Sequence, residues 1–231
     1  MKAIEIQERF GLDSLKIVER PDPRPGAGQV LIKIRAASLN YRDLLMTLGQ
    51  YNPRQKLPLV PLSDGAGEVV EVGEGVTRVQ AGARVAGIFA QEWIAGEPTR
   101  EKLRATLGGP LDGMLREYAV LSEDGVIPIP DHLSFVEAAA LPCAAVTAWN
   151  ALITQGGVKA GDTVLVQGTG GVSLFALQFA SMVGARVIVT SSSDEKLERA
   201  VRLGASDRIN YKAEPDWDKR ARELTGGAGV D

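Results

Sequence analysis

Thr163-Val164-Leu165-Val166-Gln167 and the residues after it, Gly168-Thr169-Gly170-Gly171-Val172-Ser173, decide the fold of this chain. The first five residues form an almost continuous apolar run, as expected of a parallel strand that is buried on both faces. A glycine cluster comes next, and apolar residues then recur at helical spacing until Gly184, which stands where a C-terminal cap belongs. A strand, a glycine-rich turn and a helix in this order indicate a unit that binds the pyrophosphate of a dinucleotide.

The glycines of this turn have distinct expected roles. Gly168 permits a tight turn, and Gly170 lets the backbone approach a pyrophosphate without a Cβ in the way. The helix N-terminus offers unpaired N–H groups to the anion. Ser173 replaces the third glycine of the pattern and is small enough for close packing of the helix on the strand. The residues expected to contact the cofactor are Gly168, Thr169, Gly170, Gly171 and Val172. The alternative is a glycine-rich turn without a ligand.

The end of the second strand, expected over residues 186–190, decides between the two nicotinamide coenzymes. An NAD enzyme usually presents an acidic residue there, whereas this chain has serines at 191–193 and Lys196 one turn on. Hydroxyl groups and a positive charge suit a 2′-phosphate, so NADPH is favoured over NADH. The residues expected to make this choice are Ser191, Ser192 and Lys196. The alternative is that Ser192 and Glu195 form a capping box and that Lys196 is a solvated surface residue, which leaves the coenzyme undecided.

The chain as a whole divides into two halves with different patterns of apolar residues. Residues 2–129 consist of short apolar runs broken by Gly, Pro and Asp, which indicates a β-rich half with one short helix over 41–46. Beyond it, an Ala-rich helical segment over 135–151 precedes the alternating strand-sized and helix-sized segments of a parallel sheet. We therefore expect two domains, 1–129 and 130–231.

The composition favours a small-molecule partner. The net charge of −3 and the pI near 5.4 give no attraction to nucleic acid or to anionic lipid. No apolar run approaches the roughly 20 residues of a membrane span, and the first residues lack the apolar stretch of a signal peptide. The single cysteine, Cys143, excludes an internal disulfide and fits a reducing compartment. We expect a cytoplasmic protein without nucleic-acid or membrane partners.

Four blocks, in order along the chain, resemble the medium-chain dehydrogenase/reductase superfamily, especially its zinc-free branch of quinone oxidoreductases and alcohol dehydrogenase-like proteins. The blocks are Ala37 to Asp43, Asp64 to Gly73, Leu141 to Trp149 and Gly168 to Ser173. The resemblance implies a GroES-like β-barrel catalytic domain followed by a Rossmann parallel sheet, with substrate and nicotinamide meeting in the cleft between them. It also implies a homodimer when the chain is complete.

Zinc members of that superfamily hold a catalytic metal with a Cys, a His and a Cys or acidic ligand. The positions that match these ligands are Asn40, Ser63 and Cys143, and one thiol cannot hold zinc. The segment 91–112, which matches the lobe with a structural zinc in relatives, contains no cysteine. His132, the only histidine, stands in a loop-like surface setting. We expect no zinc, and we interpret Cys143 as a packing residue rather than a nucleophile.

Without a metal, the chemistry relies on hydride from a positioned nicotinamide and on a proton from a side chain or water. Quinones and conjugated enones suit such a site because their conjugation spreads the charge that develops. Tyr51, after Gly49-Gln50, resembles the tyrosine that donates a proton in enoyl reductase relatives, and packing beneath the cleft is its alternative role. Asn40, in an N-x-x-D pattern with Asp43, is expected to bind substrate or the nicotinamide ribose, while Asp43 holds the loop. Thr147 resembles the threonine beside the nicotinamide.

In complete relatives, a sequence like residues 226–231 leads into further strands of the Rossmann sheet. The sequence therefore predicts a partial Rossmann domain that exposes a sheet edge, with doubtful activity on its own. Three functions stay open: a quinone or enone reductase, a zinc-free alcohol dehydrogenase-like enzyme, and an NADPH-binding protein without activity, as among lens crystallin relatives.

Overall fold

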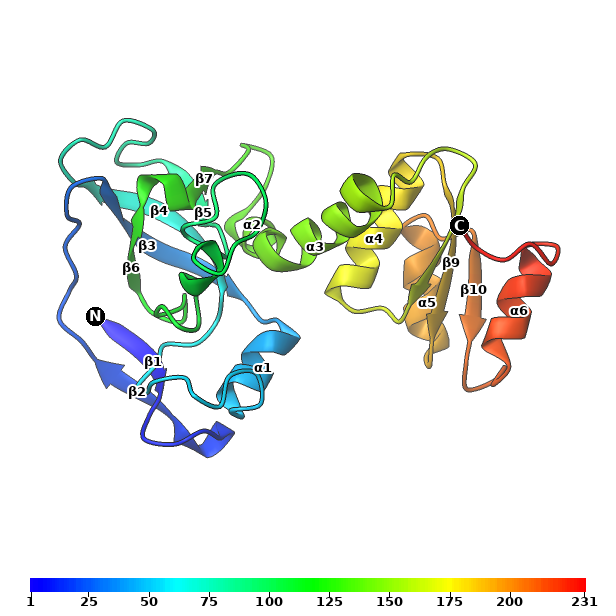
Figure 1. The fold of residues 1–231 in the computed structure, drawn as a ribbon, viewed down its shortest axis with the longest axis horizontal. Coiled ribbons are helices and arrows are strands. Elements are labelled where there is room, and N and C mark those ends of the chain that lie inside the picture. The colour runs from blue at the N-terminus through cyan, green and yellow to red at the C-terminus, as the bar shows by residue number, and fades with distance from the viewer. The chain divides into compact units, whose positions relative to one another are not determined.

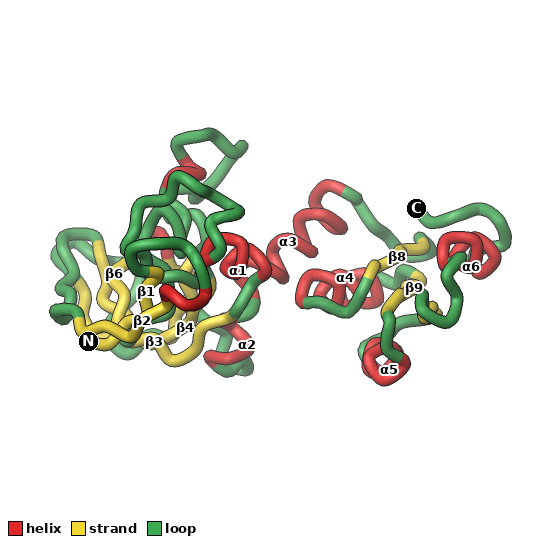
Figure 2. Tube along the Cα trace, turned by 90° about the horizontal axis from the view of Figure 1, so that it is seen from below, coloured by secondary structure: helices red, strands yellow, loops and turns green.

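The structure is a computed structural model that describes all residues from Met1 to Asp231. The chain forms two compact units, Met1–Cys143 and Ala144–Asp231 (Figure 1). Strands and loops make up most of the first unit, and strands alternate with helices in the second (Figure 2). This order confirms the GroES-like β-rich domain followed by a Rossmann-like parallel sheet that the sequence predicts.

A five-stranded antiparallel sheet with the order β6-β3-β4-β5-β7 forms the centre of the first unit. Its strands are β3 (Gln29–Ser38), β4 (Asp64–Val72), β5 (Arg84–Gly87), β6 (Tyr118–Ser122) and β7 (Val126–Pro128). The register between β3 and β4 shifts twice, at Leu31/Ile32 and at Ile34/Ala36. Such irregularities bend a strand and increase its twist, so the sheet curls.

The core of the first unit lies on the inner face of this sheet. Val30 and Ile32 of β3, Val69 of β4 and Val85 of β5 are buried together with Met114. The two β3 residues are two positions apart because successive side chains of a strand point to opposite faces. A hairpin of β1 (Lys2–Ile6) and β2 (Leu15–Glu19) forms a second, two-stranded antiparallel sheet.

Short helices complete the first unit. They are α1 (Tyr41–Thr47), α2 (Phe135–Ala139) and the 3₁₀ turns η1 (Leu12–Ser14), η2 (Lys102–Arg104) and η3 (Glu123–Gly125). Helix α2 begins with a capping box, in which the Ser134 side chain accepts from the N–H of Glu137 and the Glu137 carboxylate accepts from the N–H of Ser134. Its buried residues Ala138 and Ala139 pack with Ala66 of β4.

The second unit is built on three parallel strands in the order β10-β9-β8. The strands are β8 (Thr163–Gln167), β9 (Arg186–Ser191) and β10 (Asp207–Asn210), and the helices are α3 (Val146–Trp149), α4 (Gly171–Met182), α5 (Asp194–Arg202) and α6 (Trp217–Leu224). Successive residues of β9 enter two different cores. Val187 packs in the core that contains Leu177 of α4, whereas Ile188 packs with Ala221 of α6. The central strand is therefore covered on both faces, as its apolar sequence requires.

The strand β8 lies at one edge of this sheet. The N–H of Asp231 donates to the carbonyl oxygen of Thr163 (3.0 Å), and the N–H of Thr163 donates to the Asp231 carboxylate (2.8 Å). The first residue of the edge strand is thus paired with the last residue of the chain.

The helical segment that the sequence predicts over 135–151 is interrupted. Helix α2 ends at Ala139, and a π-helical turn, η4 (Leu141–Ala145), comes before α3 and a second π turn, η5 (Asn150–Gln155). Pro142 explains the interruption because a proline has no N–H to continue the helix and clashes with the preceding turn. The units divide after Cys143 rather than after residue 129 because α2 packs against β3 and β4 of the first unit.

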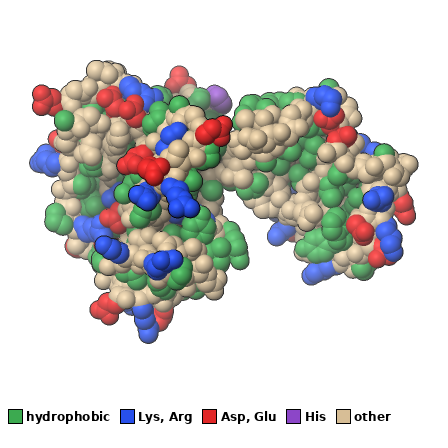
Figure 3. All heavy atoms as spheres, in the orientation of Figure 1, with side chains coloured by type: hydrophobic (Ala, Val, Ile, Leu, Met, Phe, Trp, Pro, Cys, Tyr) green, Lys and Arg blue, Asp and Glu red, His purple; other side chains and the backbone are tan.

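Acidic and basic side chains are interspersed over the face that Figure 3 shows, so this face carries no continuous patch of one sign. Several charged side chains of the molecule are paired: Arg78 with Asp124, Arg199 with Glu195 and Lys219 with Asp216. None of the helices has the length and apolar character needed to cross a membrane.

Candidate active site

The glycine-rich turn has the conformation that the sequence predicts. Gly168 has a φ of +81°, in the region that favours glycine, and its N–H donates to the carbonyl oxygen of Thr190 on β9 (2.9 Å). The Thr190 hydroxyl oxygen accepts from the same N–H at 3.3 Å. Thr190 therefore fixes the turn from the neighbouring strand, a role that sequence reasoning missed because it depends on the alignment of β8 with β9.

The N-terminus of α4 is open to a ligand. Gly170 is its N-cap, and no side chain caps the first N–H groups. A Cβ at Gly168 or Gly170 would meet no atom within 4 Å, so there is open space beside the backbone at both positions. The Ser173 hydroxyl donates to the carbonyl oxygen of Gln167 (2.9 Å), which ties the helix to the end of β8. A turn of this shape fits a pyrophosphate, since its N–H groups and the helix dipole favour an anion.

The residues after β9 differ in part from the sequence prediction. Helix α5 is capped by Ser193, whose hydroxyl oxygen accepts from the N–H of Lys196 (3.4 Å), so a capping box of Ser192 and Glu195 is wrong. Ser191 is buried, and its hydroxyl oxygen accepts from the N–H of Ser193 (3.4 Å). The side chain of Lys196 is exposed and makes no ion pair in the structure. The N-cap of α5 lies one residue later than predicted because β9 continues through Ser191.

Thr147 is exposed on the short helix α3, in the same unit as the glycine-rich turn. Trp149 of this helix packs edge-on against Phe179 of α4, with the ring centroids 5.3 Å apart. The helix that carries Thr147 is thereby fixed to the helix that begins at the turn. Val172, on the first turn of α4, is also exposed.

In the first unit, Asn40 is the N-cap of α1. Its N–H donates to the Asp43 carboxylate (2.8 Å), and the N–H of Asp43 donates to the carbonyl oxygen of Asn40 (2.9 Å). Asp43 also accepts from the N–H of Ser63 (3.2 Å), so it joins the start of α1 to the residue before β4. Asp43 thus holds the loop, as the N-x-x-D pattern predicts.

A second buried carboxylate, Asp64, lies beside this loop. The Ser63 hydroxyl donates to Asp64 Oδ1 (2.9 Å), and the N–H of Cys143 donates to Asp64 Oδ2 (3.0 Å). Ser63 and Asp64 are completely buried, and Asp43 is 2% exposed. Burial raises the pKa of Asp43 and of Asp64, and the hydrogen bonds to each carboxylate oppose this effect. Sequence reasoning missed Asp64, although an acidic residue at the start of an apolar strand is a usable signal.

The Asn40 side chain belongs to the capping box of α1, where it accepts from the N–H of Asp43, and its amide nitrogen takes no part in this box. Its Nδ2 is buried and has no hydrogen-bond partner. The amide nevertheless contributes to lowering the pKa of Asp64. Its effect is thus that of a nearby donor dipole, since the hydrogen-bond geometry is not met.

The donor set at these positions does not fit zinc. The three matched positions supply an amide, a hydroxyl and one thiol, whereas zinc sites in proteins use thiolate, imidazole and carboxylate ligands. No three His, Cys, Asp or Glu side chains cluster as a metal site would require. Both oxygens of the nearby Asp64 carboxylate are occupied by donors from the protein.

Tyr51 is held by an arginine that sequence reasoning missed. The Arg42 guanidinium carbon lies 4.8 Å from the centroid of the Tyr51 ring and 4.8 Å from that of Phe89. Arg42 also donates to the carbonyl oxygens of Leu107 (3.1 Å) and Gly109 (2.7 Å). Tyr51 remains 54% exposed, so its phenol is accessible while its ring is stacked.

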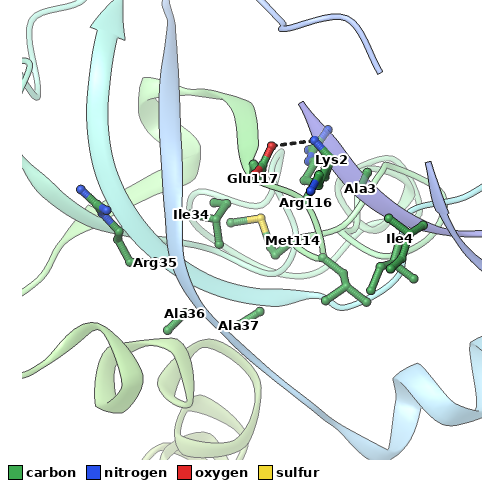
Figure 4. Close-up of a pocket in the computed structure, with 12 residues that line it drawn as sticks. Lys2, Ala3, Ile4, Ile34, Arg35, Ala36, Ala37, Met114, Arg116 and Glu117 are labelled. Carbon is green, nitrogen blue, oxygen red and sulfur yellow. Dashed lines mark hydrogen bonds between the residues drawn. The ribbon is translucent and has the colours of Figure 1, made fainter. Parts of the chain in front are cut away.

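A cavity of about 430 Å³ lies elsewhere in the first unit, between β1, β3 and the segment 114–117. Ile34 and Met114 point toward each other in it (Figure 4). The Arg116 side chain lines the cavity, and its buried Nε has no hydrogen-bond partner. Burial lowers the pKa of Arg116. None of the sequence-predicted site residues lines this cavity.

Comparison with known proteins places these features in a family. Residues 26–131 match the alcohol dehydrogenase GroES-like domain, and residues 171–231 match the zinc-binding dehydrogenase family. The chain is 44% identical to a putative alcohol dehydrogenase from Sinorhizobium meliloti, with a TM-score of 0.88, and covers 69% of that chain and 100% of its own length. This chain belongs to the medium-chain dehydrogenase/reductase superfamily. The resemblance drawn from the four sequence blocks is therefore confirmed.

Among curated superfamily members, a zinc-type alcohol dehydrogenase-like protein from Schizosaccharomyces pombe is 50% identical over 225 residues, which are 96% of this chain and 65% of that protein. An acryloyl-coenzyme A reductase from Metallosphaera sedula is 36% identical over 85% of this chain and 60% of its own length. The chain thus spans less than two thirds of these relatives.

Two further solved structures of the superfamily differ in the coenzyme that their descriptions name. One is an NAD-dependent alcohol dehydrogenase, with 39% identity and a TM-score of 0.91 over the whole of this chain and 69% of its own. The other is a mycobacterial protein in complex with NADPH, with 33% identity and a TM-score of 0.79 over the whole of this chain and 64% of its own. Membership of the superfamily alone therefore does not choose the coenzyme.

Proposed function

We propose that the protein transfers hydride from NADPH to a quinone or a conjugated enone without a metal. One observation carries the proposal. The three positions that match the zinc ligands of metal-dependent members hold Asn40, Ser63 and Cys143, and two of them donate hydrogen bonds to the buried Asp64 carboxylate. A site that presents donors where a metal would need ligands suits an acceptor that is already electron-poor.

The dinucleotide is assigned to the second unit. The backbone of Gly168, Thr169, Gly170 and Gly171 and the N-terminus of α4 hold the pyrophosphate, with Val172 beside it. Thr147, exposed on α3, contacts the nicotinamide. When bound, the coenzyme supplies the hydride.

The residues at the end of β9 favour NADPH. No carboxylate stands there, where an NAD-specific protein binds the ribose hydroxyls. The first acidic residue after the strand, Asp194, accepts from the Asn210 side chain (2.7 Å). The side chain of Lys196 is exposed and can pair with a 2′-phosphate together with the hydroxyl of Ser192, whereas Ser191, also expected there, is buried.

The acceptor is assigned to Tyr51 and Asn40. The exposed phenol of Tyr51 donates the proton that completes the reduction, and Arg42 keeps its ring in place. The Asn40 amide donates to the carbonyl oxygen of the acceptor. Conjugation spreads the negative charge that hydride transfer creates, so one amide donor replaces the stronger polarisation of a metal.

A substrate panel tests this proposal. NADPH oxidation is measured at neutral pH with a benzoquinone, a conjugated enone and a simple ketone, each with and without a chelator. We expect turnover of the quinone or the enone that the chelator leaves unchanged. Turnover of the ketone alone would favour an alcohol dehydrogenase-like enzyme, the alternative that agrees with the names of several relatives. Calorimetric binding of NADPH without any turnover would instead leave a nucleotide-binding protein.

A further inference from the structure

Three separated segments meet at the carboxylate of Asp64. Asp64 opens β4, where it pairs in register with Ser38 at the end of β3. Its Oδ1 accepts from the Ser63 hydroxyl, and its Oδ2 accepts from the N–H of Cys143, 79 positions away in the sequence. Asn40 lies two residues beyond Ser38, and its side-chain nitrogen is buried without a hydrogen-bond partner.

These donors occupy the three positions that match metal ligands in zinc members of the superfamily. A zinc ion is a cation that gathers electron-pair donors. In this chain the Asp64 carboxylate accepts from the Ser63 side chain and from the backbone N–H of Cys143. The same segments are thus joined through hydrogen bonds to a carboxylate.

We propose that Asp64 is the positioning residue of this metal-free site, ordering the Asn40 side chain, the Ser63 hydroxyl and the amide of Cys143. The effect of this ordering on turnover rests on the proposed function. The ordering itself is a property of the folded chain.

Burial argues that the carboxylate has more than a packing role. Asp64 is completely inaccessible to solvent, and no cation forms an ion pair with it. Arg42 lowers the pKa of Asp64 through space only, because its guanidinium group is engaged with carbonyl oxygens and aromatic rings. A buried carboxylate without an ion-pair partner is costly unless hydrogen bonds satisfy it. An apolar side chain would fill the space at lower cost, but it would leave the Ser63 and Cys143 donors without an acceptor.

The Asn40 side-chain nitrogen has no hydrogen-bond partner in the protein, so it can donate to a substrate. An amide that is held beside a carboxylate, but not bonded to it, keeps a donor available after a small rotation. The carboxylate fixes which end of the amide faces it, because the Nδ2 end is attracted and the oxygen is repelled. Asp64 therefore sets the orientation in which Asn40 offers its donor to an acceptor.

The test compares Asp64→Asn with Asp43→Asn in the full chain. Asparagine keeps the shape of Asp64 but offers one acceptor oxygen instead of two. By amide hydrogen exchange, we expect Asp64→Asn to exchange the Cys143 N–H about tenfold faster, the loss that one hydrogen bond represents. In Asp43→Asn the Cys143 N–H keeps its protection, whereas the Ser63 N–H loses protection.

A second readout is the resonances of the Asn40 side chain. In wild type, its two amide protons give separate, orientation-fixed resonances, and in Asp64→Asn these shift and broaden as the amide samples both orientations. If Asp64→Asn does not fold, Ser63→Ala removes one donor from the same carboxylate, and the Asn40 resonances are compared there. Unchanged Cys143 exchange and unchanged Asn40 resonances in a folded Asp64 variant would overturn the proposal.

Kinetics separate positioning from structure. For the acceptor of the substrate panel, we expect kcat of Asp64→Asn to fall about 10²-fold, as for misplaced reacting groups, with an unchanged KM for NADPH. Equal kcat in wild type and variant, despite faster Cys143 exchange, would reduce Asp64 to a structural residue and overturn the positioning role. Absence of turnover in wild type would contradict the proposed function, and the Asn40 resonances would then decide on Asp64 alone.

Discussion

The Arg42 guanidinium is stacked on the ring of Tyr51, with 4.8 Å between the guanidinium carbon and the ring centroid. The same guanidinium carbon lies 4.8 Å from the centroid of the Phe89 ring, so the cation contacts two aromatic rings. Planar guanidinium groups stack in this way, whereas an ammonium group does not. The arginine after Asn40-Tyr41 thereby links α1 to the candidate proton donor and to the loop of Leu107 and Gly109.

We expect Arg42→Lys to lower the free energy of unfolding by about 1–2 kcal/mol, because it removes charged hydrogen bonds to two carbonyl oxygens as well as the stack. Urea denaturation measures this loss. Arg54→Lys, at an exposed arginine of the next loop, is the control and leaves stability unchanged within about 0.5 kcal/mol. Equal stability of Arg42→Lys and wild type would show that the stack contributes nothing.

Tyr51→Phe removes the phenolic hydroxyl group and keeps the aromatic ring that contacts Arg42. We expect kcat with an enone to fall about 10²-fold, within the range for loss of a general acid, while stability is unchanged. Tyr41→Phe, at a tyrosine that is 75% exposed in the same segment, is the matched control and retains full turnover. Wild-type turnover by Tyr51→Phe would remove this residue from the mechanism.

Two glycines of the turn, Gly168 and Gly170, should respond differently to alanine. Gly170 has a φ of −78° and open space at its Cβ position, so Gly170→Ala folds normally, but its methyl group stands where the pyrophosphate approaches. We expect its Kd for NADPH, measured by calorimetry, to rise at least about tenfold. Gly168→Ala meets no atom either, but the φ of +81° is unfavourable for alanine, so its unfolding free energy falls by about 1 kcal/mol. Unchanged NADPH binding by Gly170→Ala would place the coenzyme elsewhere.

Lys196→Ala tests the choice of coenzyme. Removal of a positive charge from the 2′-phosphate should weaken NADPH binding about tenfold and leave NADH binding unchanged, because NADH lacks this phosphate. The control is Lys159→Ala, at an exposed lysine before the opposite end of β8, which changes neither Kd. Parallel loss of NADPH and NADH affinity would contradict a role in discrimination.

The pair of buried acids predicts a pH dependence of stability. Burial raises the folded-state pKa of Asp43 and Asp64 above the ordinary value of 3.8, which holds in the unfolded chain. At a pH between the unfolded-state pKa and the folded-state pKa, the folded chain therefore holds more protons than the unfolded chain. Their contribution to stability is therefore full below about pH 3.8 and is lost as the pH rises through the raised pKa. We expect the free energy of unfolding of wild type, relative to an Asp43→Asn/Asp64→Asn variant, to decrease over this interval. A difference that is constant with pH, in urea denaturation curves, would contradict the raised pKa values.

The local elements of the second unit could be predicted because their signals lie within a few residues. The apolar run of β8, the glycines after it and the helical spacing of α4 fix a strand, a turn and a helix in succession. The cap of α5 was displaced by one residue because three consecutive serines give the same local signal, and only the length of β9 selects Ser193. The predicted helix over 135–151 is interrupted at η4 (Leu141–Ala145), which contains Pro142.

The sequence by itself determined the two-part fold, the glycine-rich turn and the amide, hydroxyl and thiol side chains at positions 40, 63 and 143, because residue type and short-range spacing decide each of them. Only the tertiary structure decided that Asp64 joins Ser63 to Cys143 and that Arg42 contacts the rings of both Tyr51 and Phe89. Cys143 and Asp64 are 79 positions apart, and Arg42 and Phe89 are separated by β4 and β5. Such contacts depend on which strands pair and in which register, and the free energy of burying a charge is set by everything that surrounds it in the folded chain.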